Sequence, residues 1–399
     1  MAYTFDPFDA EQVQSAWPRL AELRRRSPVA QLAEGMVYLP RYGECRQVLR
    51  DSDHFSNASG FKAPGVVVEL EDRTLGELAP PRHTAVRRVM MAVLVPRVVR
   101  SAEGFIRSTA EKLLDRRPVD LVAGFTVPLP NATTVHLLGF PAEDSVQIGA
   151  WAKELMESGF PATNRSDRGE GFARAFPEFA AYIDARLDER AAELESGGGR
   201  LRDDAHHPDD VLTGLLRGEL SRRQRRAMVR NLITGGLTTT SQLIGNLLDL
   251  VLTDAAADRA VRGGSLPVAI EESLRLRPPV MFVPRGCTGD VEVGGCPVHA
   301  GTRVIVGVAS ANRDETVFAD AGSYRWDRPN ADAHLTFGYG RHACPGASLA
   351  RTVARIAMEV FFERFPPGAV RAAADYRFEN VPTFFECGPR HLRVEYRSS

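Results

Sequence analysis

One cysteine set among glycines is the feature of the sequence with the clearest chemical potential. Residues 337–351 read FGYGRHACPGASLAR, so that Cys344 lies between glycines on both sides. Gly338 and Gly340 give the loop the backbone freedom for a tight turn and a close approach to a flat group. The apolar spacing beyond Cys344 predicts a helix, whose first N–H groups and dipole favour a thiolate. Such a thiolate is a soft ligand for a transition metal, and His342 adds a donor for an anionic cofactor.

The cysteine loop resembles the signature of the cytochrome P-450 haem-thiolate family, F-G-x-G-x-H-x-C-x-G, which bacterial members often follow with L-A-R. The matching positions are Phe337, Gly338, Gly340, His342, Cys344, Gly346, Leu349, Ala350 and Arg351. The resemblance implies that Cys344 is the axial ligand of the iron of a haem b and favours O–O cleavage. It also implies that Phe337, Gly338 and Gly346 contact the haem. The alternative, a structural thiol beside a turn, leaves the glycines unexplained.

A long helix with a weakened middle is predicted over Arg225–Leu252. Gly235 and Gly236 each cost about 1 kcal/mol relative to alanine in a helix interior. The β-branched threonines that follow lose side-chain freedom there as well. The pattern indicates that a ligand approaches the backbone or that the helix bulges. Close packing of another helix against the glycines is the alternative.

The weakened stretch resembles the family segment (A/G)-G-x-(D/E)-T-(T/S), which lies over the distal face of the haem. Gly235, Gly236, Thr239 and Thr240 match, while Thr238 stands where the family has an acid. The resemblance implies that both glycines border the haem and that Thr239 and Thr238 are the catalytic residues. The family's acid–alcohol pair helps to deliver protons to dioxygen, but Thr238 can only order water and has no carboxyl group.

Further basic residues fit a cofactor that carries carboxylate arms. His83 and Arg87 are four residues apart on a predicted helix and can reach one anion together. Arg285 follows the apolar stretch VMFVP, and its planar guanidinium suits a carboxylate. Taken singly, such residues are more often solvated or act as caps. The resemblance implies that His83, Arg87, Arg285 and His342 bind the haem propionates.

An acidic and a basic residue three positions apart form a second motif. Glu272 and Arg275, in AIEESLRLRPP, share one face of a predicted helix that the prolines end. An isolated pair of this kind is usually on the surface and contributes about 0–1 kcal/mol. Its place in the chain resembles the family's E-x-x-R motif, whose pair joins a later arginine, here Arg328. We therefore expect these three residues to be structural.

The elements that must hold these residues are mostly helices. Apolar residues three and four apart predict helices, and short alternating stretches predict strands. The predicted helices are Ala102–Leu114, Phe176–Leu194, Arg225–Leu252 and Leu349–Phe362, and the predicted strands are Gly35–Leu39, Val291–Val293, Thr302–Val308 and His391–Tyr396. We expect a mainly α chain of the α+β class, with a large helical body and small β-sheets. The resemblance implies the cytochrome P-450 fold around a buried haem, with residues 1–399 as one domain.

Composition excludes several classes of protein. A chain of 399 residues with 44% apolar and 25% charged residues is typical of a globular protein. The net charge of -1 leaves no basic excess for nucleic acid or an anionic membrane. Five scattered cysteines favour neither a disulfide framework nor a zinc site. No stretch reads as a signal peptide or a membrane span, so we expect a cytoplasmic protein.

The resemblance implies a function. It implies a bacterial haem-thiolate monooxygenase, an oxidoreductase that inserts one oxygen atom of O2 into an apolar small molecule, such as one of natural-product biosynthesis. Electrons would come from NAD(P)H through a ferredoxin and a ferredoxin reductase, and the enzyme would be a monomer. Exposed arginines at 88, 97, 100 and 341 are expected to form a basic patch for the ferredoxin. Two alternatives remain: oxidative coupling or another non-hydroxylating reaction, and a haem-binding sensor.

Candidate substrate contacts are apolar residues in stretches that line the pocket of family members. They are Leu232, Leu237, Phe282, Phe384 and Phe385, with Val66, Val67, Val68 and Phe160 as further candidates. Such residues are more often ordinary core, so the sequence does not identify the substrate.

Overall fold

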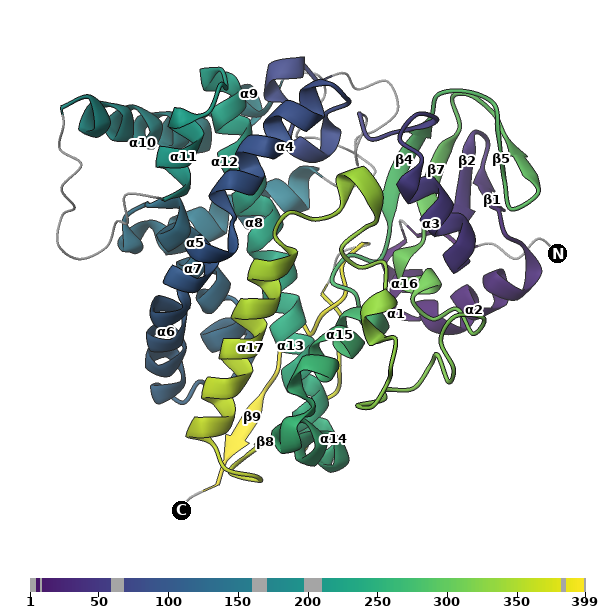
Figure 1. The fold of residues 1–399 in the computed structure, drawn as a ribbon. Coiled ribbons are helices and arrows are strands. Elements are labelled where there is room, and N and C mark those ends of the chain that lie inside the picture. Colours follow the sequence, from purple (N-terminus) through teal and green to yellow (C-terminus); the bar gives the residue numbers. More distant parts are fainter. Residues whose placement is uncertain are drawn as a thin grey trace.

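The computed structural model describes residues 5–7, 9–58, 68–159, 171–196, 210–381 and 385–397. Figure 1 shows a large helical part on one side and a smaller part built around a β-sheet on the other. The cysteine loop, residues 337–346, leads into the long helix α17 (Ala347–Arg364) at the front of the helical part. The predicted class, a helical body with small sheets, is confirmed.

Helices make up most of the described chain. In the helical part they are α4 (Arg82–Val93), α5 (Pro96–Ser101), α6 (Glu103–Asp115), α7 (Pro128–Leu138), α8 (Ser145–Gly159), α9 (Phe172–Ala175), α10 (Pro177–Glu195), α11 (Val211–Arg217), α12 (Arg222–Gly236), α13 (Thr238–Thr253), α14 (Ala255–Ala260), α15 (Leu266–Leu276) and α17. Near the sheet lie α1 (Ala10–Gln14), α2 (Ala16–Arg26), α3 (Tyr42–Arg50) and α16 (Val308–Ala311). Among the described helices, none combines the length and the apolar character that a membrane-spanning helix needs.

Within the described residues, the main sheet has five strands. Their order is β1 (Ala30–Ala33), β2 (Met36–Leu39), β7 (Arg303–Val306), β4 (Val283–Cys287) and β3 (Phe55–Ser56). β2 is parallel to β7, whereas β4 is antiparallel to β7 and pairs Arg285 with Val304. Two smaller sheets pair β5 (Val291–Val293) with β6 (Cys296–Val298), and β8 (Val370–Ala372) with β9 (Val394–Tyr396). The pairing with β7 fixes the strand that carries Arg285.

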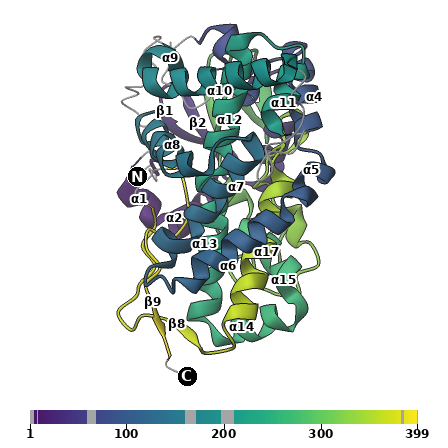
Figure 2. The same ribbon diagram turned by 90° about the vertical axis from the view of Figure 1, so that its left-hand side faces the viewer.

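The core of the helical part is built around α13 and α17. α13 has buried residues on nearly every side, which is typical of a helix enclosed by others. It packs against α17, α15 and α7, and α17 packs in turn along α6. Figure 2 shows α6, α13 and α17 next to one another in the middle of the molecule. The start of α13 is therefore held in place by several neighbouring helices.

One predicted helix is wrong in its extent. The helices predicted around α6, α10 and α17 are confirmed within a few residues. The helix predicted over Arg225–Leu252 is instead two helices, α12 and α13, which are separated at Leu237, where φ is -81° and ψ is -68°. The hydroxyl of Thr239 donates to the carbonyl of Gly235 at 2.8 Å. The hydroxyl of Thr239 thus competes with backbone N–H groups for the carbonyl of Gly235 at the break. The break lies within the stretch that the sequence analysis predicts to be a weak part of the helix.

The predicted strands are confirmed in place, but three of them are shorter than predicted. β2 begins after Gly35, whose φ of +69° makes the preceding turn. β7 ends at Val306, because Val308 already begins the helix α16. β9 covers Val394–Tyr396 of the longer stretch predicted from His391.

Candidate active site around Cys344

The cysteine loop is a tight turn that its glycines make possible. Gly338 and Gly340 have φ of +72° and +75°, in the left-handed region that other residues rarely adopt. The amide of Cys344 donates to the carbonyl of Phe337 at 2.7 Å and so closes the turn. A side chain at position 340 would also stand 3.1 Å from the carbonyl oxygen of Leu49. The loop therefore fixes the position of the thiol.

The start of α17 and the state of the thiol differ from expectation. Pro345 suits the first turn of a helix, but α17 begins at Ala347 with Gly346 as its N-cap. Burial raises the pKa of the Cys344 thiol, and the N–H of Gly346 and the charge of Arg87 oppose this without reversing it. The N–H at the helix N-terminus acts in the direction that the sequence analysis expects, but burial outweighs it. Metal binding would have to displace the proton.

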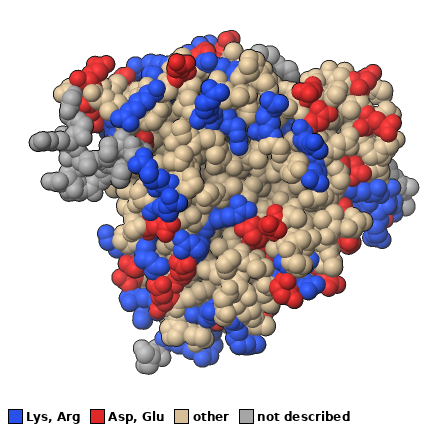
Figure 3. All heavy atoms as spheres, viewed as in Figure 1, with Lys and Arg blue, Asp and Glu red and all other residues tan. Residues whose placement is uncertain are grey.

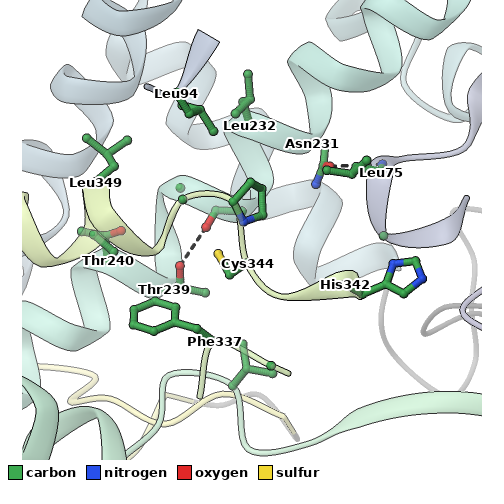
Figure 4. A pocket seen from close by; sticks show the side chains of 18 of the residues that line it. Leu75, Leu94, Asn231, Leu232, Thr239, Thr240, Phe337, His342, Cys344 and Leu349 are labelled. Carbon is green, nitrogen blue, oxygen red and sulfur yellow. Dashed lines mark hydrogen bonds between the residues drawn. The ribbon is translucent and has the colours of Figure 1, made fainter. Parts of the chain in front are cut away.

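Cys344 opens into a cavity of about 380 Å³. Figure 4 shows its thiol and Thr239, at the start of α13, among the side chains that line the cavity, with His342 on the same loop as the thiol. Much of the lining is apolar and comes from both parts of the fold. These lining residues include Leu49, Leu75, Met90, Leu94, Leu137, Leu138, Leu232, Leu243, Val280, Val283 and Leu349. The cavity therefore suits an apolar guest.

Basic side chains converge at one edge of the cavity. His83 of α4 and His342 of the cysteine loop have ring centres 4.3 Å apart. Within the described chain, both ring nitrogens of His83 and Nδ1 of His342 are buried without a hydrogen-bond partner. Arg285 of β4 is buried nearby, and Arg87 of α4 donates to the carbonyl of Ala343 at 2.9 Å. The four residues predicted to bind the haem propionates are thus brought together.

The environment of this edge disfavours positive charge. Burial lowers the pKa of His342 to about 3, with a further contribution from the neighbouring His83 and Arg285. Burial and the charge of Arg87 lower the pKa of His83. Burial also lowers the pKa of Arg285 to about 10. Buried donors without partners cost free energy, and a ligand with carboxylate groups would satisfy them.

The break between α12 and α13 forms another part of the wall. Gly235, Gly236, Thr239 and Thr240 line the cavity. Thr238 is not a lining residue, and its hydroxyl instead donates to Oε1 of Glu386 at 2.9 Å. The sequence analysis missed Glu386, because 148 positions separate the two residues and no local pattern marks the contact.

The substrate candidates are only partly brought to the cavity. Leu232 of α12 lines it. Leu237, Phe282 and Phe385 do not, and they are buried in the hydrophobic clusters behind the wall. Val68 is also buried away from the lining. Four candidates lie outside the described residues: Val66, Val67, Phe160 and Phe384.

Glu272, Arg275 and Arg328 form a buried cluster outside the cavity lining. Glu272 accepts from Arg275 at 2.7 Å and from Arg328 at 2.8 Å, and all three side chains are at most 1% exposed. Burial raises the pKa of Glu272, but the hydrogen bonds from the two arginines outweigh it, so the pKa is lowered. Arg275 also donates to the carbonyls of Asn312, Ala321 and Ser323. The cluster ties α15 to the segment before the cysteine loop.

A second ionic group supports the cysteine loop directly. The guanidinium of Arg351 on α17 lies 4.5 Å from the ring centre of Phe337. It also pairs with Glu271 of α15 at 2.7 Å, and His334 approaches the same carboxylate at 3.2 Å. The sequence analysis missed Glu271, although its position beside Glu272 in the middle of α15 was a signal.

Comparisons with known proteins cover nearly the whole chain. The sequence model of the family Cytochrome P450 matches residues 266–368, which include Cys344. Erythromycin C-12 hydroxylase of Saccharopolyspora erythraea is 31% identical over 398 residues, which cover 95% of this chain and 94% of that protein. Cytochrome P450 109 of Bacillus spizizenii is 29% identical and covers 95% of this chain and 91% of its own.

Solved structures extend the similarity to the fold. A mutant of P450 EryK in complex with erythromycin B has a TM-score of 0.85 and 29% identity, over 98% of both chains. CYP109Q5 from Chondromyces apiculatus has a TM-score of 0.84 and 27% identity, over 100% of both chains.

Proposed function

Since this chain belongs to the cytochrome P450 family, we propose that it inserts one oxygen atom of dioxygen into a bulky, largely apolar natural product. Its relatives are oxidoreductases, haem-thiolate monooxygenases with haem iron. The observation that carries the proposal is the Cys344 thiol, which opens into an apolar cavity. At the edge of this cavity, buried nitrogens of His83 and His342 have no hydrogen-bond partner among the described residues. The similarity to erythromycin C-12 hydroxylase supports hydroxylation of a natural product.

The described residues fit a haem b bound through Cys344. The loop that carries the thiol places Phe337, Gly338 and Gly346 in the cavity lining. Gly235 and Gly236 would border the haem from α12, and a side chain at Gly235 would point into open space. Carboxylate arms would give the buried nitrogens of the basic edge the acceptors that they lack. The residues that would bind the propionates are His83, Arg87, Arg285 and His342.

The residues of this chain bind, exclude water and hold protons. When bound, the haem supplies the activation of dioxygen and the oxidation of the substrate. Leu232, Leu243 and Val280 form apolar walls that favour an apolar substrate over water. The hydroxyl of Thr239, which is held on the carbonyl of Gly235, would order a water molecule and hold a proton beside the substrate.

Electrons reach this site from NAD(P)H through a ferredoxin and a ferredoxin reductase in our proposal. Arg88, Arg97, Arg100 and Arg341 are exposed on α4, α5 and the cysteine loop. Figure 3 shows basic side chains gathered over the upper half of this face of the molecule. Such a surface supports docking of an acidic electron carrier on the cysteine side.

Thr238 favours a second candidate, oxidative coupling of two parts of a substrate. Joining two substrate radicals does not itself consume a proton, although the dioxygen that serves as oxidant is still reduced to water. The bond-forming step therefore depends less on the acid that α13 lacks. Mass spectrometry of the product distinguishes the two reactions. Hydroxylation adds one oxygen atom, whereas coupling removes two hydrogen atoms. Erythromycin B, the ligand of the related EryK mutant, is the first compound to test for a shift of the ferric haem spectrum.

The variant Cys344→Ala tests the site itself. The purified wild-type protein is expected to bind a b-type haem and, when reduced under carbon monoxide, to show the red-shifted band of thiolate ligation. Cys344→Ala should lose this band, because alanine has no sulfur. The control Cys296→Ala, in β6 and away from the cavity, should keep it. A Cys344→Ala protein with an unchanged band would refute the assignment.

A further inference from the structure

A carboxyl group from the C-terminal segment reaches the position where α13 lacks one. The hydroxyl of Thr238 donates to Oε1 of Glu386 at 2.9 Å. Glu386 is only 4% exposed, so this contact is made in the interior of the protein. Thr239, the next residue of α13, lines the cavity. The carboxyl group therefore lies one side chain behind the cavity wall.

The backbone around Glu386 is held from one side by the segment before β4. Glu386 forms an antiparallel bridge with Val280. The amide of Met281 donates to the carbonyl of Phe385 at 2.7 Å. The amide of Cys387 donates to the carbonyl of Pro279 at 3.1 Å. Because Pro279 and Val280 line the cavity, the same backbone that forms its wall positions Glu386.

Polar side chains hold the same segment from the other side. Asn246 of α13 donates to the carbonyl of Cys387 at 3.1 Å. Asn380 donates to the carbonyl of Glu386 at 2.8 Å. A side chain at Gly388 would stand 2.7 Å from Cβ of Gln242 on α13, so the segment lies directly on that helix. Glu386 is thus fixed relative to Thr238 from two directions.

The cavity needs a source of protons that its own lining does not provide. Reduction of dioxygen by NAD(P)H in a monooxygenase consumes protons. The described lining residues include no aspartate or glutamate. Their basic side chains lie at the edge of the cavity beside the cysteine loop, and they are His83, Arg87, Arg285 and His342. A buried carboxyl group costs more free energy than a buried amide, and a glutamine could accept the same hydrogen bond. Unlike a glutamine, a glutamate at position 386 can also carry a proton that it releases.

We propose that Glu386 supplies protons to the cavity through Thr238. This inference rests on the proposed function. When Glu386 is protonated, the hydrogen bond seen in the structure reverses: the carboxyl O–H donates to Oγ1 of Thr238, and the hydroxyl proton of Thr238 turns to a water molecule on the side of Thr239. Oγ1 takes the proton of Glu386 as it releases its own proton to that water. The hydroxyl is restored, the carboxylate takes a new proton from solvent, and no electrons move in the step. Glu386 acts through Thr238 and not on the substrate.

The variant Glu386→Gln tests this step in the haem-loaded protein. The measurement is dioxygen consumption with NADPH, a plant-type ferredoxin and its reductase, in H2O and in D2O. Glutamine keeps the acceptor for Thr238 but has no proton to release. We expect consumption to slow by about 100-fold and its solvent isotope effect to rise. The matched control is Glu379→Gln, an exposed acid of the same segment that pairs with Arg390 and should change neither quantity.

Two further readouts separate proton supply from a structural role. In the wild type, infrared difference spectroscopy should show a carboxylic acid band that is absent in Glu386→Gln and shifted in Thr238→Val. In the Glu386→Gln background, Thr238→Asp should restore much of the consumption rate, because it places an acid on α13 itself. A purely structural contact predicts no rescue and no change in the isotope effect.

The outcomes are decisive for each proposal separately. Unchanged consumption and isotope effect in Glu386→Gln would overturn the inference, as would a loss that Thr238→Asp does not rescue. Every variant is first shown to keep the thiolate-type carbon monoxide band. If the wild type itself lacks that band, the proposed function fails, and not only the role of Glu386.

Discussion

Glu272 carries its charge in the interior because its partners replace the water that it has lost. Arg275 and Arg328 donate to its two oxygens, and the amide of Arg325 adds a hydrogen bond at 3.0 Å. Removal of one member of such a group leaves the remaining charges without compensation. The loss of a partner from a buried ion pair costs about 3–5 kcal/mol, which is a large part of the stability of a typical protein.

We therefore predict that Glu272→Ala lowers the free energy of unfolding by about 3–5 kcal/mol. Urea unfolding, followed by circular dichroism, measures it. The control is Glu363→Ala, which removes a carboxylate that is 60% exposed and pairs with Arg107 at the surface. That change should cost about 0–1 kcal/mol. Equal costs for both variants would contradict the buried role of Glu272.

Single residues of the site differ in how well the sequence predicts them. The cysteine loop is predictable because its glycines, its cysteine and the helix that follows are contiguous. The spacing of His83 and Arg87 marks them as a pair, but their assignment with Arg285 to one cofactor comes only from the family resemblance, since the fold alone brings Arg285 to them. Glu386 was not found, because its contact with Thr238 depends on the path of the C-terminal segment along α13.

At the scale of elements, Glu271 connects the middle of α15 to the first turns of α17. Its carboxylate pairs with Arg351, which also lies over Phe337 in the cysteine loop. Burial raises the pKa of Glu271, but the hydrogen bonds from Arg351 and His334 outweigh it and lower the pKa to about 2 from 4.5. The ionised form is thus preferred in the folded protein, and the connection depends on pH.

The sign of this dependence follows from the lowered pKa. The contribution of Glu271 is fully present above its unfolded pKa of 4.5 and is lost as the pH falls toward 2. Its size is about 3 kcal/mol. We predict that Glu271→Gln has a lower melting temperature than the wild type near pH 7, and that this difference shrinks as the pH falls below 4.5. Calorimetry across this range measures it.

The matched control for the pH series is Glu363→Gln on α17. Its carboxylate is exposed, so its melting temperature should follow that of the wild type at every pH. A difference between Glu271→Gln and the wild type that stays constant down to pH 2 would show that Glu271 contributes through packing and not through its charge.

Elements are predictable from the sequence where local periodicity decides them. α6, α10 and α17 have clear amphipathic spacing and lie where predicted. The break at Leu237 was marked by glycines and threonines, but its position depends on the side-chain bond of Thr239. β3 has only two residues and exists through its pairing with β4, far along the chain, which no local pattern contains.

At the scale of the whole molecule, the cavity lies where the helical part meets the sheet part. α4, α12 and α13 contribute from one side, and β4 and α16 from the other. The cysteine loop covers the cavity toward the face seen in Figure 3, so this face is the short route to the thiol. A redox partner that docks there would approach Cys344 without entering the apolar cavity.

Charge on this face should therefore control electron delivery. Arg88, Arg97 and Arg100 are exposed on α4 and α5. Attraction between exposed charges is screened over about 8 Å at physiological ionic strength. We predict that reduction of the haem protein by an acidic ferredoxin slows by about 10-fold between low and physiological salt. Stopped-flow absorbance at several salt concentrations measures this rate.

Matched variants assign the effect to this face and not to the net charge. Replacing Arg88, Arg97 and Arg100 by serine should slow reduction at low salt and flatten its salt dependence. Replacing Arg371 by serine removes an exposed charge on β8, which lies at the opposite end of the molecule in Figure 1. That variant should behave like the wild type, because the docking surface is unchanged. If it slows reduction as much as the three changes on α4 and α5 do, or if salt has no effect, the ferredoxin docks elsewhere.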